Sequence, residues 1–522
     1  MPKRFFASFA AGLLCWTFAA AAQTRSTGAH ERPALVLLVA IDQFRYDYLT
    51  RFRSEYTGGL KLLVDRGAVF VNANLEHYPT VTAIGHSTML SGATPTTSGI
   101  IGNDWYDRAS GKRVTSVSDD QTKLLGGNGG RGSSPRRLLV STVGDELKRS
   151  SSAGSKVLGL SLKDRAAILP AGRMADAAYW YSEDTGEFVS STYFFSEVPA
   201  WVREFNNQKL ADTFKGKTWL DAANGQKERG IAATIGPKFY STIYGSPYGN
   251  DLLESFAERA MEAEQLGRRG VTDLLSVSFS SNDSIGHTYG PDSPEVHAVA
   301  IAVDRTIGRF LSFVDRTVGL NKVLVILTSD HGVAPGPETL EREKLPGGRL
   351  KTKLADPAQQ ALEARYGAGN WVLDTTGASL YLNNALIADH RLDPGEVQKT
   401  AARALSALPE VARVYTREEM LAGRYPVDRF EARVLRGFNP SRSGDVEVIL
   451  HPYWIRDTAG ATHGTPYNYD AHIPLVFMGT GIRPGKYYRA AALNDLAPTV
   501  SAWLDVEIPS GSSGRILDEM FE

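Results

Sequence analysis

The stretch that decides the fold is VLVILTSDHG, residues 323–332, in which an unbroken apolar run ends at a serine, an aspartate and a histidine. A short apolar run without alternation is typical of a strand covered on both faces, as in a parallel sheet. ALVLLVAID (34–42) and DLLSVSF (273–279) have the same form. Residues 156–162 and 474–478 are weaker examples. These runs predict a mostly parallel sheet.

Helical patterns lie between the predicted strands, with apolar residues recurring every three or four positions. The clearest occupy residues 58–66, 250–266, 294–314 and 495–504. Alternation of strands and helices predicts an α/β fold in which helices flank a mostly parallel central sheet. Two stretches interrupt this alternation, at about 166–249 and 335–460, and we expect both to be inserted cap segments.

Residues 1–22 are predicted to be a Sec signal peptide. Lys3 and Arg4 precede an apolar run from Phe5 to Phe18, and small residues follow at Ala20 to Ala22. The run, about 14 residues, is shorter than the ~20 needed to cross a bilayer, which favours a cleaved leader over a retained anchor. We therefore expect a periplasmic or secreted protein, residues 23–522, without a membrane segment after cleavage.

Composition limits the kinds of site that the mature chain can build. The single cysteine, Cys15, lies inside the predicted leader. Disulfides and thiolate metal sites are therefore excluded, and metal ligands must be histidine, aspartate or glutamate. The formal net charge of -1 gives no reason to expect a nucleic-acid-binding surface. The sequence leaves the oligomeric state open.

Acidic residues and histidines recur near the ends of the predicted strands. They are Asp42, Asp283, His287, Asp330, His331 and His463. In open α/β sheets, groups at the carboxyl ends of strands converge on a ligand site. Three carboxylates and three imidazoles suit two divalent ions with three protein ligands each. Gly286 and the preceding strand predict a loop around Asp283, and a lone aspartate at a strand end is also a common helix cap.

A second informative stretch is HYPTVTAIGHSTMLSGATPTTSGIIGND, residues 77–104. Thr82 opens a predicted helix, where free backbone amides and the helix dipole favour a phosphate. A threonine hydroxyl is a poor nucleophile at neutral pH and needs a metal ion to activate it. The alternative is that Thr82 only caps the helix. His86, four residues later, is expected to be a packed structural group.

Residues 77–104 resemble the nucleophile region of the alkaline phosphatase superfamily. The resemblance extends from ALVLLVAIDQFRYDYL (34–49) to DLAPTVSAWL (495–504), and is greatest to phosphate-irrepressible alkaline phosphatases of the nucleotide pyrophosphatase/phosphodiesterase-like branch. It implies that Thr82 attacks phosphorus and that Asn103, 21 residues later, binds a phosphoryl oxygen.

The resemblance also implies two zinc ions. The ligands of the zinc that activates the nucleophile would be Asp42, Asp330 and His331. The ligands of the zinc that stabilises the leaving oxygen would be Asp283, His287 and His463. Two such ions would clamp the entering and leaving oxygens of an in-line displacement.

LSLKDR, residues 160–165, bears on the substrate. Lys163 and Arg165 are two apart at a predicted strand end, so an extended backbone would point both to one side. Such a cationic pair suits a dianionic monoester better than a diester. Phosphate-irrepressible alkaline phosphatases carry this Lys-x-Arg, and the diesterase relatives lack it.

The sequence thus predicts a secreted alkaline phosphatase that hydrolyses small phosphate monoesters through a phosphothreonine intermediate at a two-zinc site. The alternatives are a phosphodiesterase or nucleotide pyrophosphatase on the same scaffold, and a zinc- or phosphate-binding protein without turnover.

Overall fold

An 11-stranded sheet forms the centre of the computed structural model, which describes residues 32–150, 154–222, 227–423 and 428–521. Its five middle strands run parallel, as expected from their apolar sequences. In spatial order they are β14 (Val323–Thr328), β1 (Leu35–Ile41), β13 (Asp273–Phe279), β8 (Val157–Ser161) and β9 (Ala177–Tyr181). The predicted leader, residues 1–22, lies outside the described residues.

The sheet becomes antiparallel on both sides of this parallel centre. On one side, β21 (Leu475–Met478) runs antiparallel to β14, so the prediction of a fifth parallel strand here was wrong. Beyond it lie β2 (Ala68–Phe70) and β22 (Gly485–Tyr487). The other side consists of β10 (Phe188–Ser191), β6 (Ser118–Leu125) and β7 (Arg131–Ser133). The sheet is therefore mixed, with its parallel strands in the middle.

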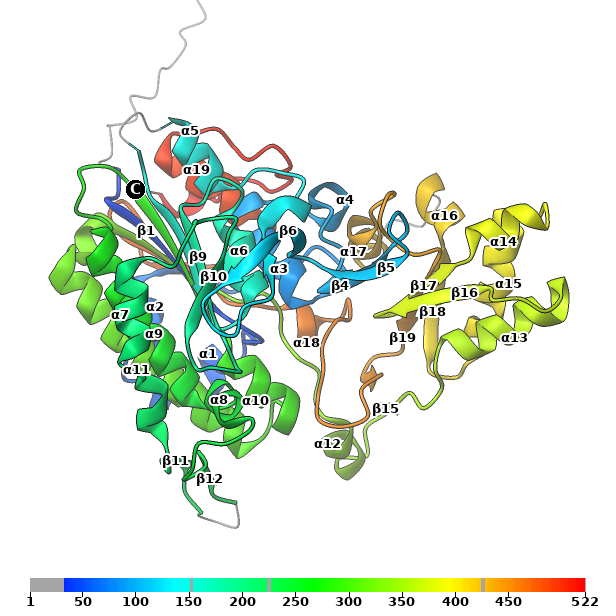
Figure 1. Ribbon diagram of the computed structural model, residues 1–522, viewed down its shortest axis with the longest axis horizontal. Helices are drawn as coiled ribbons and strands as arrows, with labels where there is room; N and C mark the ends of the chain where they lie inside the picture. Colours follow the sequence, from blue (N-terminus) through cyan, green and yellow to red (C-terminus); the bar gives the residue numbers. More distant parts are fainter. Residues whose placement is uncertain (1–31, 151–153, 223–226, 424–427, 522) are drawn as a thin grey trace, which may run out of the picture. The chain divides into compact units, whose positions relative to one another are not determined.

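Both faces of β1 are buried, which explains its unbroken apolar sequence. Its odd-numbered residues join a core cluster with α2 (Gly59–Arg66), α9 (Pro247–Glu264) and α11 (Pro294–Thr317). Its even-numbered residues join a second cluster with α3 (Thr82–Ser91), α5 (Val143–Ser150) and α19 (Leu496–Leu504). This division follows from the two-residue period of a strand. In Figure 1, α9 and α11 lie side by side in green.

The two stretches that interrupt the sequence pattern have different structures. Residues 166–249 contribute β9 and β10 to the main sheet, together with α7 (Ala200–Asn207) and α8 (Phe239–Tyr244). Residues 335–460 contain a separate four-stranded sheet, shown in yellow and orange at the right of Figure 1. Its spatial order is β16 (Val372–Thr376), β17 (Ser379–Leu382), β19 (Val446–Leu450) and β18 (Val411–Thr416).

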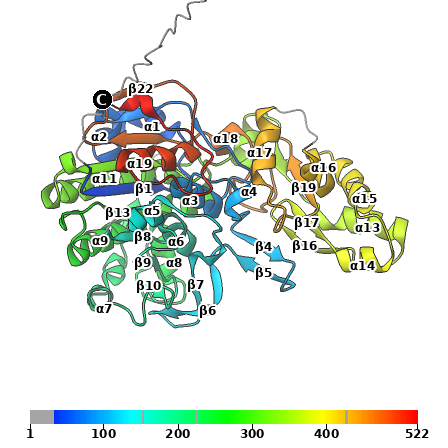
Figure 2. The same ribbon diagram turned by 90° about the horizontal axis from the view of Figure 1, so that it is seen from above.

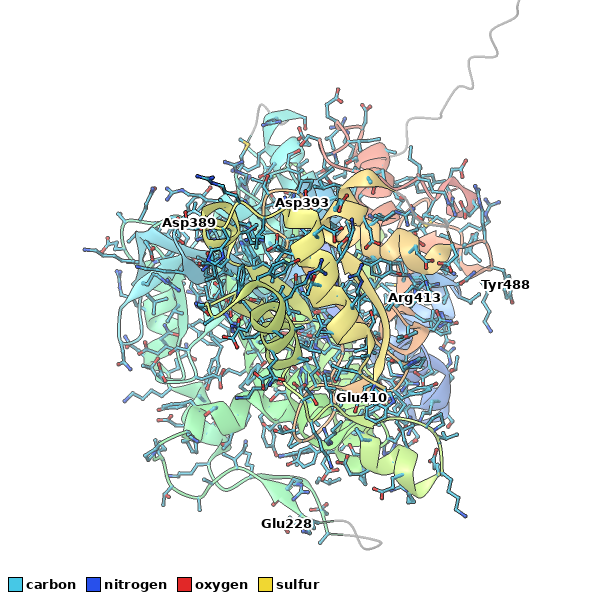
Figure 3. The ribbon with its side chains drawn as sticks, turned by 90° about the vertical axis from the view of Figure 1, so that its right-hand side faces the viewer. Glu228, Asp389, Asp393, Glu410, Arg413 and Tyr488 are labelled. Atoms are coloured by element: carbon cyan, nitrogen blue, oxygen red, sulfur yellow. The ribbon has the colours of Figure 1, made fainter. Side chains whose placement is uncertain are left out.

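This smaller sheet has its own apolar core against α13 (Ala355–Tyr366) and α15 (Pro394–Ser406). Asp393, labelled in Figure 3, caps α15 by accepting the Glu396 amide at 2.8 Å. The hairpin of β4 (Asp104–Asp107) and β5 (Lys112–Thr115) lies beside β16, as Figure 2 shows. No helix among the described residues is both long and apolar enough to span a bilayer.

Candidate active site

The parallel strands deliver the predicted metal ligands to one end of the sheet. Asp42 directly follows β1, and Asp330 and His331 follow β14. Asp283 and His287 lie on α10 (Ser281–Tyr289), which begins two residues after β13. The spacing of four therefore places both side chains on one face of a helix.

The prediction of a loop around Asp283 was wrong. Gly286 does not break the helix; it lies where the Gln43 side chain packs closely against α10. A Cβ added to Gly286 would lie 1.8 Å from Oε1 of Gln43. A side chain at position 286 would displace the Gln43 amide from its present position, and α10 continues through the glycine without interruption. The sequence alone gives no sign of this contact between Gly286 and Gln43.

Asp42, Asp330 and His331 form the first group of possible metal ligands. Their ligand atoms lie within 4.8 Å of one another. His331 Nε2 is 3.3 Å from Asp330 Oδ2 and 3.6 Å from Asp42 Oδ1, and all three side chains are fully buried. Within the described chain, Asp42 Oδ1 has no hydrogen-bond partner. A buried anionic oxygen without a donor fits a cation.

Asp283, His287 and His463 form the second group. His287 Nε2 lies 3.3 Å from Asp283 Oδ1 and 3.2 Å from His463 Nε2, and His463 Nε2 lies 3.7 Å from Asp283 Oδ1. The two groups adjoin, because the His331 and His463 rings stack with their centroids 3.5 Å apart. Asp283, His331 and His463 are also close enough to hold an ion together. All six predicted ligands thus meet in one cluster.

Backbone carbonyls orient the three imidazoles. The Nδ1 atoms of His287, His331 and His463 lie 2.8, 3.0 and 2.8 Å from the carbonyl oxygens of Ala461, Gly332 and Thr80. Carbonyl oxygens only accept, so each Nδ1 carries the proton and each Nε2 presents a lone pair to the cluster. This is the arrangement that metal-ligating histidines need.

The cluster crowds three buried carboxylates together, and the single ammonium of Lys163 balances only part of their charge. Burial raises the pKa of Asp42, and the neighbouring Asp283 and Asp330 raise it further. Burial lowers the pKa of His463 well below its usual value, and nearby His331 and His287 lower it further. A neutral imidazole and crowded carboxylates favour the binding of divalent cations over protons.

Thr82 is the first residue of α3 and is almost fully buried. Its Oγ1 lies 3.4 Å from His331 Nε2, which places the hydroxyl at the ligand cluster. Asn103 Oδ1 accepts the Ala83 amide at 2.9 Å. That bond leaves the side-chain nitrogen of Asn103 as the donor end beside the start of α3.

Lys163 and Arg165 do not both lie at a strand end, so that part of the prediction was wrong. β8 ends at Ser161, Lys163 is the N-cap residue of α6 (Asp164–Ala171), and Arg165 lies in its first turn. Lys163 Nζ donates to Asp42 Oδ2 at 2.6 Å and to Asp283 Oδ2 at 2.5 Å. Among the described residues, Arg165 Nε is buried without a hydrogen-bond partner.

Gln43 is a site residue that the sequence did not indicate. Its backbone amide donates to Asp330 Oδ1 at 3.1 Å, and its side-chain nitrogen donates to Asp283 Oδ1 at 2.7 Å. It therefore orients one carboxylate from each ligand group. Its φ of 60° is in the left-handed region, which costs a residue other than glycine about 1 kcal/mol. Backbone strain of this kind is often stored at functional sites.

His86 is packed as expected. Its Nδ1 lies 2.9 Å from the Thr82 carbonyl oxygen and 3.2 Å from Asp330 Oδ2, and its Nε2 lies 2.7 Å from Ser278 Oγ. The ring joins the first turn of α3 to the neighbouring strand β13. The His86 ring thereby also helps to hold the Asp330 carboxylate in position.

Gln43→Gly is expected to weaken metal binding by about ten- to a hundredfold, the usual cost of losing a residue that orients a ligand. In the metal-free protein, the relief of left-handed strain should offset only part of the lost buried hydrogen bond to Asp283, so a small loss of stability is expected. Competition with a chelator measures the affinity. Gln265→Gly is the matched control, because Gln265 also has a positive φ of 54° but lies exposed after α9. Equal metal affinity in both variants would contradict the role of Gln43.

Comparisons with known proteins agree with this geometry. Residues 36–468 match the family described as type I phosphodiesterase / nucleotide pyrophosphatase. A protein named calcium-transporting ATPase from Myroides odoratus is 36% identical, over 94% of this chain and 95% of that protein. Alkaline phosphatase PafA from Elizabethkingia meningoseptica is 34% identical, over 95% of this chain and 96% of that protein.

The fold also matches a solved structure. The crystal structure of wild-type alkaline phosphatase PafA superposes with a TM-score of 0.86 at 33% identity, covering 95% of this chain and all of that one. All six predicted metal ligands lie within the matched residues 36–468. The chain therefore belongs to the type I phosphodiesterase / nucleotide pyrophosphatase family, on the branch that includes the alkaline phosphatase PafA.

Proposed function

We propose that the protein is an alkaline phosphatase that hydrolyses phosphate monoesters with Thr82 as its nucleophile. The observation that carries the proposal is the position of the Thr82 hydroxyl, at the start of α3 and 3.4 Å from Nε2 of His331 in the ligand cluster. Relatives named alkaline phosphatases, similar over nearly their full length, support it.

Two divalent ions fit the cluster, and zinc suits its oxygen and nitrogen donors. Asp42, Asp330 and His331 would hold one ion, and the remaining group, Asp283, His287 and His463, would hold the other. When bound, such ions stabilise negative charge on the entering and leaving oxygens.

The reaction then has two displacements at phosphorus. In the first, a bond forms from Thr82 Oγ1 to phosphorus while the bond to the ester oxygen breaks, and the alcohol leaves after taking a proton. In the second, a water oxygen bonds to phosphorus, the bond to Thr82 breaks, and phosphate is released. The start of α3 and the Asn103 amide nitrogen would hold phosphoryl oxygens.

The preference for monoesters rests on Lys163 and Arg165. Although burial opposes it, Asp283 and Asp42 raise the pKa of Lys163, so its ammonium stays charged. Arg165 lies close enough to Lys163 to affect that pKa. A monoester dianion gains more than a diester from two cations. We further propose that residues 1–22 direct the protein to the periplasm or the medium.

The test compares kcat/KM for p-nitrophenyl phosphate and its methyl diester with zinc-loaded protein. We expect a monoester preference that falls by about a hundredfold in Lys163→Ala/Arg165→Ala, because two charge-assisted contacts are lost. Lys215→Ala/Lys217→Ala, an exposed pair with the same spacing, is the control. A diester preference in the wild-type protein would overturn the substrate assignment but leave the nucleophile in place.

A further inference from the structure

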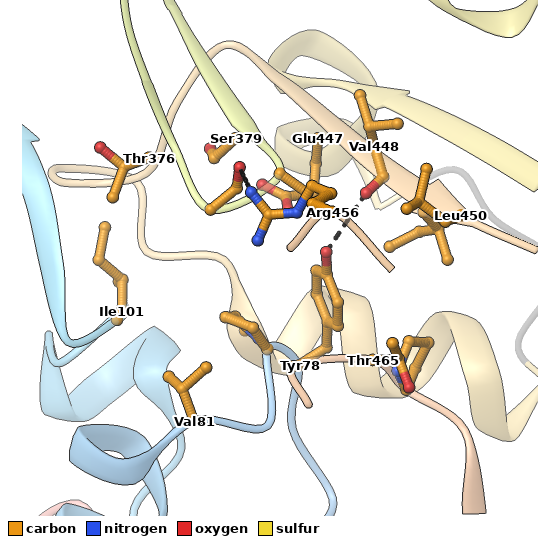
Figure 4. Close-up of a pocket in the computed structure, with 18 of the residues that line it drawn as sticks. Tyr78, Val81, Ile101, Thr376, Ser379, Glu447, Val448, Leu450, Arg456 and Thr465 are labelled. Carbon is orange, nitrogen blue, oxygen red and sulfur yellow. Dashed lines mark hydrogen bonds between the residues drawn. The ribbon is translucent and has the colours of Figure 1, made fainter. Parts of the chain in front are cut away.

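A pocket leads from the ligand cluster toward the four-stranded sheet. Its volume is about 330 Å³, at the lower end of the range of roughly 300–1,000 Å³ that is typical of small-molecule sites. The segment from Tyr78 to Val81 forms one wall, and residues of β17 and β19 form the opposite wall (Figure 4). The pocket therefore joins two parts of the chain that are far apart in sequence.

The inner end of the pocket identifies which part of a substrate would enter it. Asn103, His287 and His463 line this end. Under the proposed function, which this inference deepens, the two histidines belong to the group that stabilises the leaving oxygen. The pocket thus lies on the leaving-group side and would receive the alcohol portion of the ester.

The carboxyl group of Glu447 and the guanidinium of Arg456 line the far end of the pocket, and they do not form an ion pair with each other. Burial raises the pKa of Glu447 to about 7, although the nearby side chains of Ser379 and Tyr78 oppose that rise. Arg456 donates to the Gly377 carbonyl, and Figure 4 shows it beside Glu447. The positive charge of Arg456 acts on Glu447, as its lowering effect on that pKa indicates.

At this end of the pocket, the two opposite charges disfavour a leaving group that carries a single charge of either sign. Arg456 would repel an ammonium group that approached Glu447, and Glu447 would repel a carboxylate that approached Arg456. Neutral hydroxyl groups fit, since each can donate to the carboxyl of Glu447 and accept from the guanidinium of Arg456. The hydroxyl of Tyr78 adds a further polar group at the same end, 3.3 Å from the Val448 carbonyl.

The remaining walls combine aromatic and aliphatic side chains with polar ones, including the carboxylates of Asp104 and Asp457. Trp105, Tyr381 and Trp454 line the pocket together with Val81 and Ile101. Such walls pack against apolar ring faces, while a few polar groups fix the orientation of the ligand. A sugar ring has both features, with C–H groups on its faces and hydroxyls around its edge.

We propose that this pocket selects phosphate esters of sugar-sized polyhydroxylated alcohols, and that Glu447 and Arg456 bind the sugar hydroxyls. The subsite makes these two residues determinants of specificity. The displacement at phosphorus is unchanged, because neither residue belongs to the ligand cluster or the nucleophile segment.

The experiment compares kcat/KM for D-glucose 6-phosphate with that for cyclohexylmethyl phosphate, which has a similar ring without hydroxyls. In zinc-loaded Glu447→Gln, we expect about a tenfold loss for the sugar ester and less than a twofold change for the cyclohexyl ester. Arg456→Met should show the same pattern independently. Glu410→Gln, on the surface of the same segment, is the matched control and should change neither value.

Binding gives a second readout. Calorimetry with the phosphonate analogue of glucose 6-phosphate should show a Kd about tenfold weaker in both pocket variants. Equal losses on the two esters, no loss in either variant, or a selective loss for O-phosphoserine would overturn the sugar assignment. Failure of the wild-type protein on every monoester, p-nitrophenyl phosphate included, would instead overturn the proposed function.

Discussion

Thr82→Ala is expected to lower kcat/KM for p-nitrophenyl phosphate by about a thousandfold or more, while the metal content stays unchanged. The change removes the hydroxyl, which is the proposed nucleophile at the start of α3, together with the γ-methyl group. The six predicted metal ligands lie on other elements, so they should keep their positions. The residual rate would come from the ions and the phosphate-binding groups, which remain.

Rapid quenching with labelled substrate provides the direct measurement. Wild-type protein should acquire covalent phosphate on Thr82, and Thr82→Ala should acquire none. Thr82→Ser restores a hydroxyl and should recover part of the rate. Thr80→Ala is a further control. The Thr80 hydroxyl donates to the Thr465 carbonyl at 2.8 Å, so it stabilises the loop around Thr465 and is not a candidate nucleophile. Wild-type turnover in Thr82→Ala would refute the assignment of the nucleophile.

Metal-free Lys163→Ala is expected to be less stable than metal-free wild-type protein by about 3–5 kcal/mol. Lys163 Nζ is hydrogen-bonded to the buried carboxylates of both Asp42 and Asp283. Removing the ammonium leaves two buried negative charges without compensation, which is the costly way to break such a contact. Divalent ions would restore the charge balance, so the difference should shrink in zinc-loaded protein.

Urea unfolding of chelated and zinc-loaded samples measures both differences. Lys156→Ala is the control, since the Lys156–Glu264 ion pair is partly exposed and should contribute less than about 1 kcal/mol. An equal loss of stability with and without zinc would show that Lys163 acts by packing rather than by charge.

The parallel centre of the sheet could be predicted because its signal is local. Each of β1, β13 and β14 is a fully buried and largely apolar run, and candidate site residues follow soon after each of them. The direction of β21 could not be predicted, because it depends on the path of the preceding chain. A buried apolar run has the same composition in either direction.

The site residues that escaped prediction act through contacts distant in sequence. Glu447 lies 369 positions from Tyr78, with which it lines the pocket, and nothing between them marks the pair. Gln43 has a left-handed backbone that is usually associated with glycine or asparagine, so its sequence gives no sign of it. The residues of the ligand cluster were easier to select as candidates, because aspartate and histidine shortly after a buried strand are conspicuous in the sequence.

The contact between Gln43 and Gly286 constrains the order in which this site can change during evolution. While Gln43 is present, any side chain at position 286 would collide with Oε1 of that glutamine. A small residue at position 43 removes the obstacle. A side chain at position 286 would therefore push the Gln43 amide away from Asp283, unless position 43 had already changed to a smaller residue.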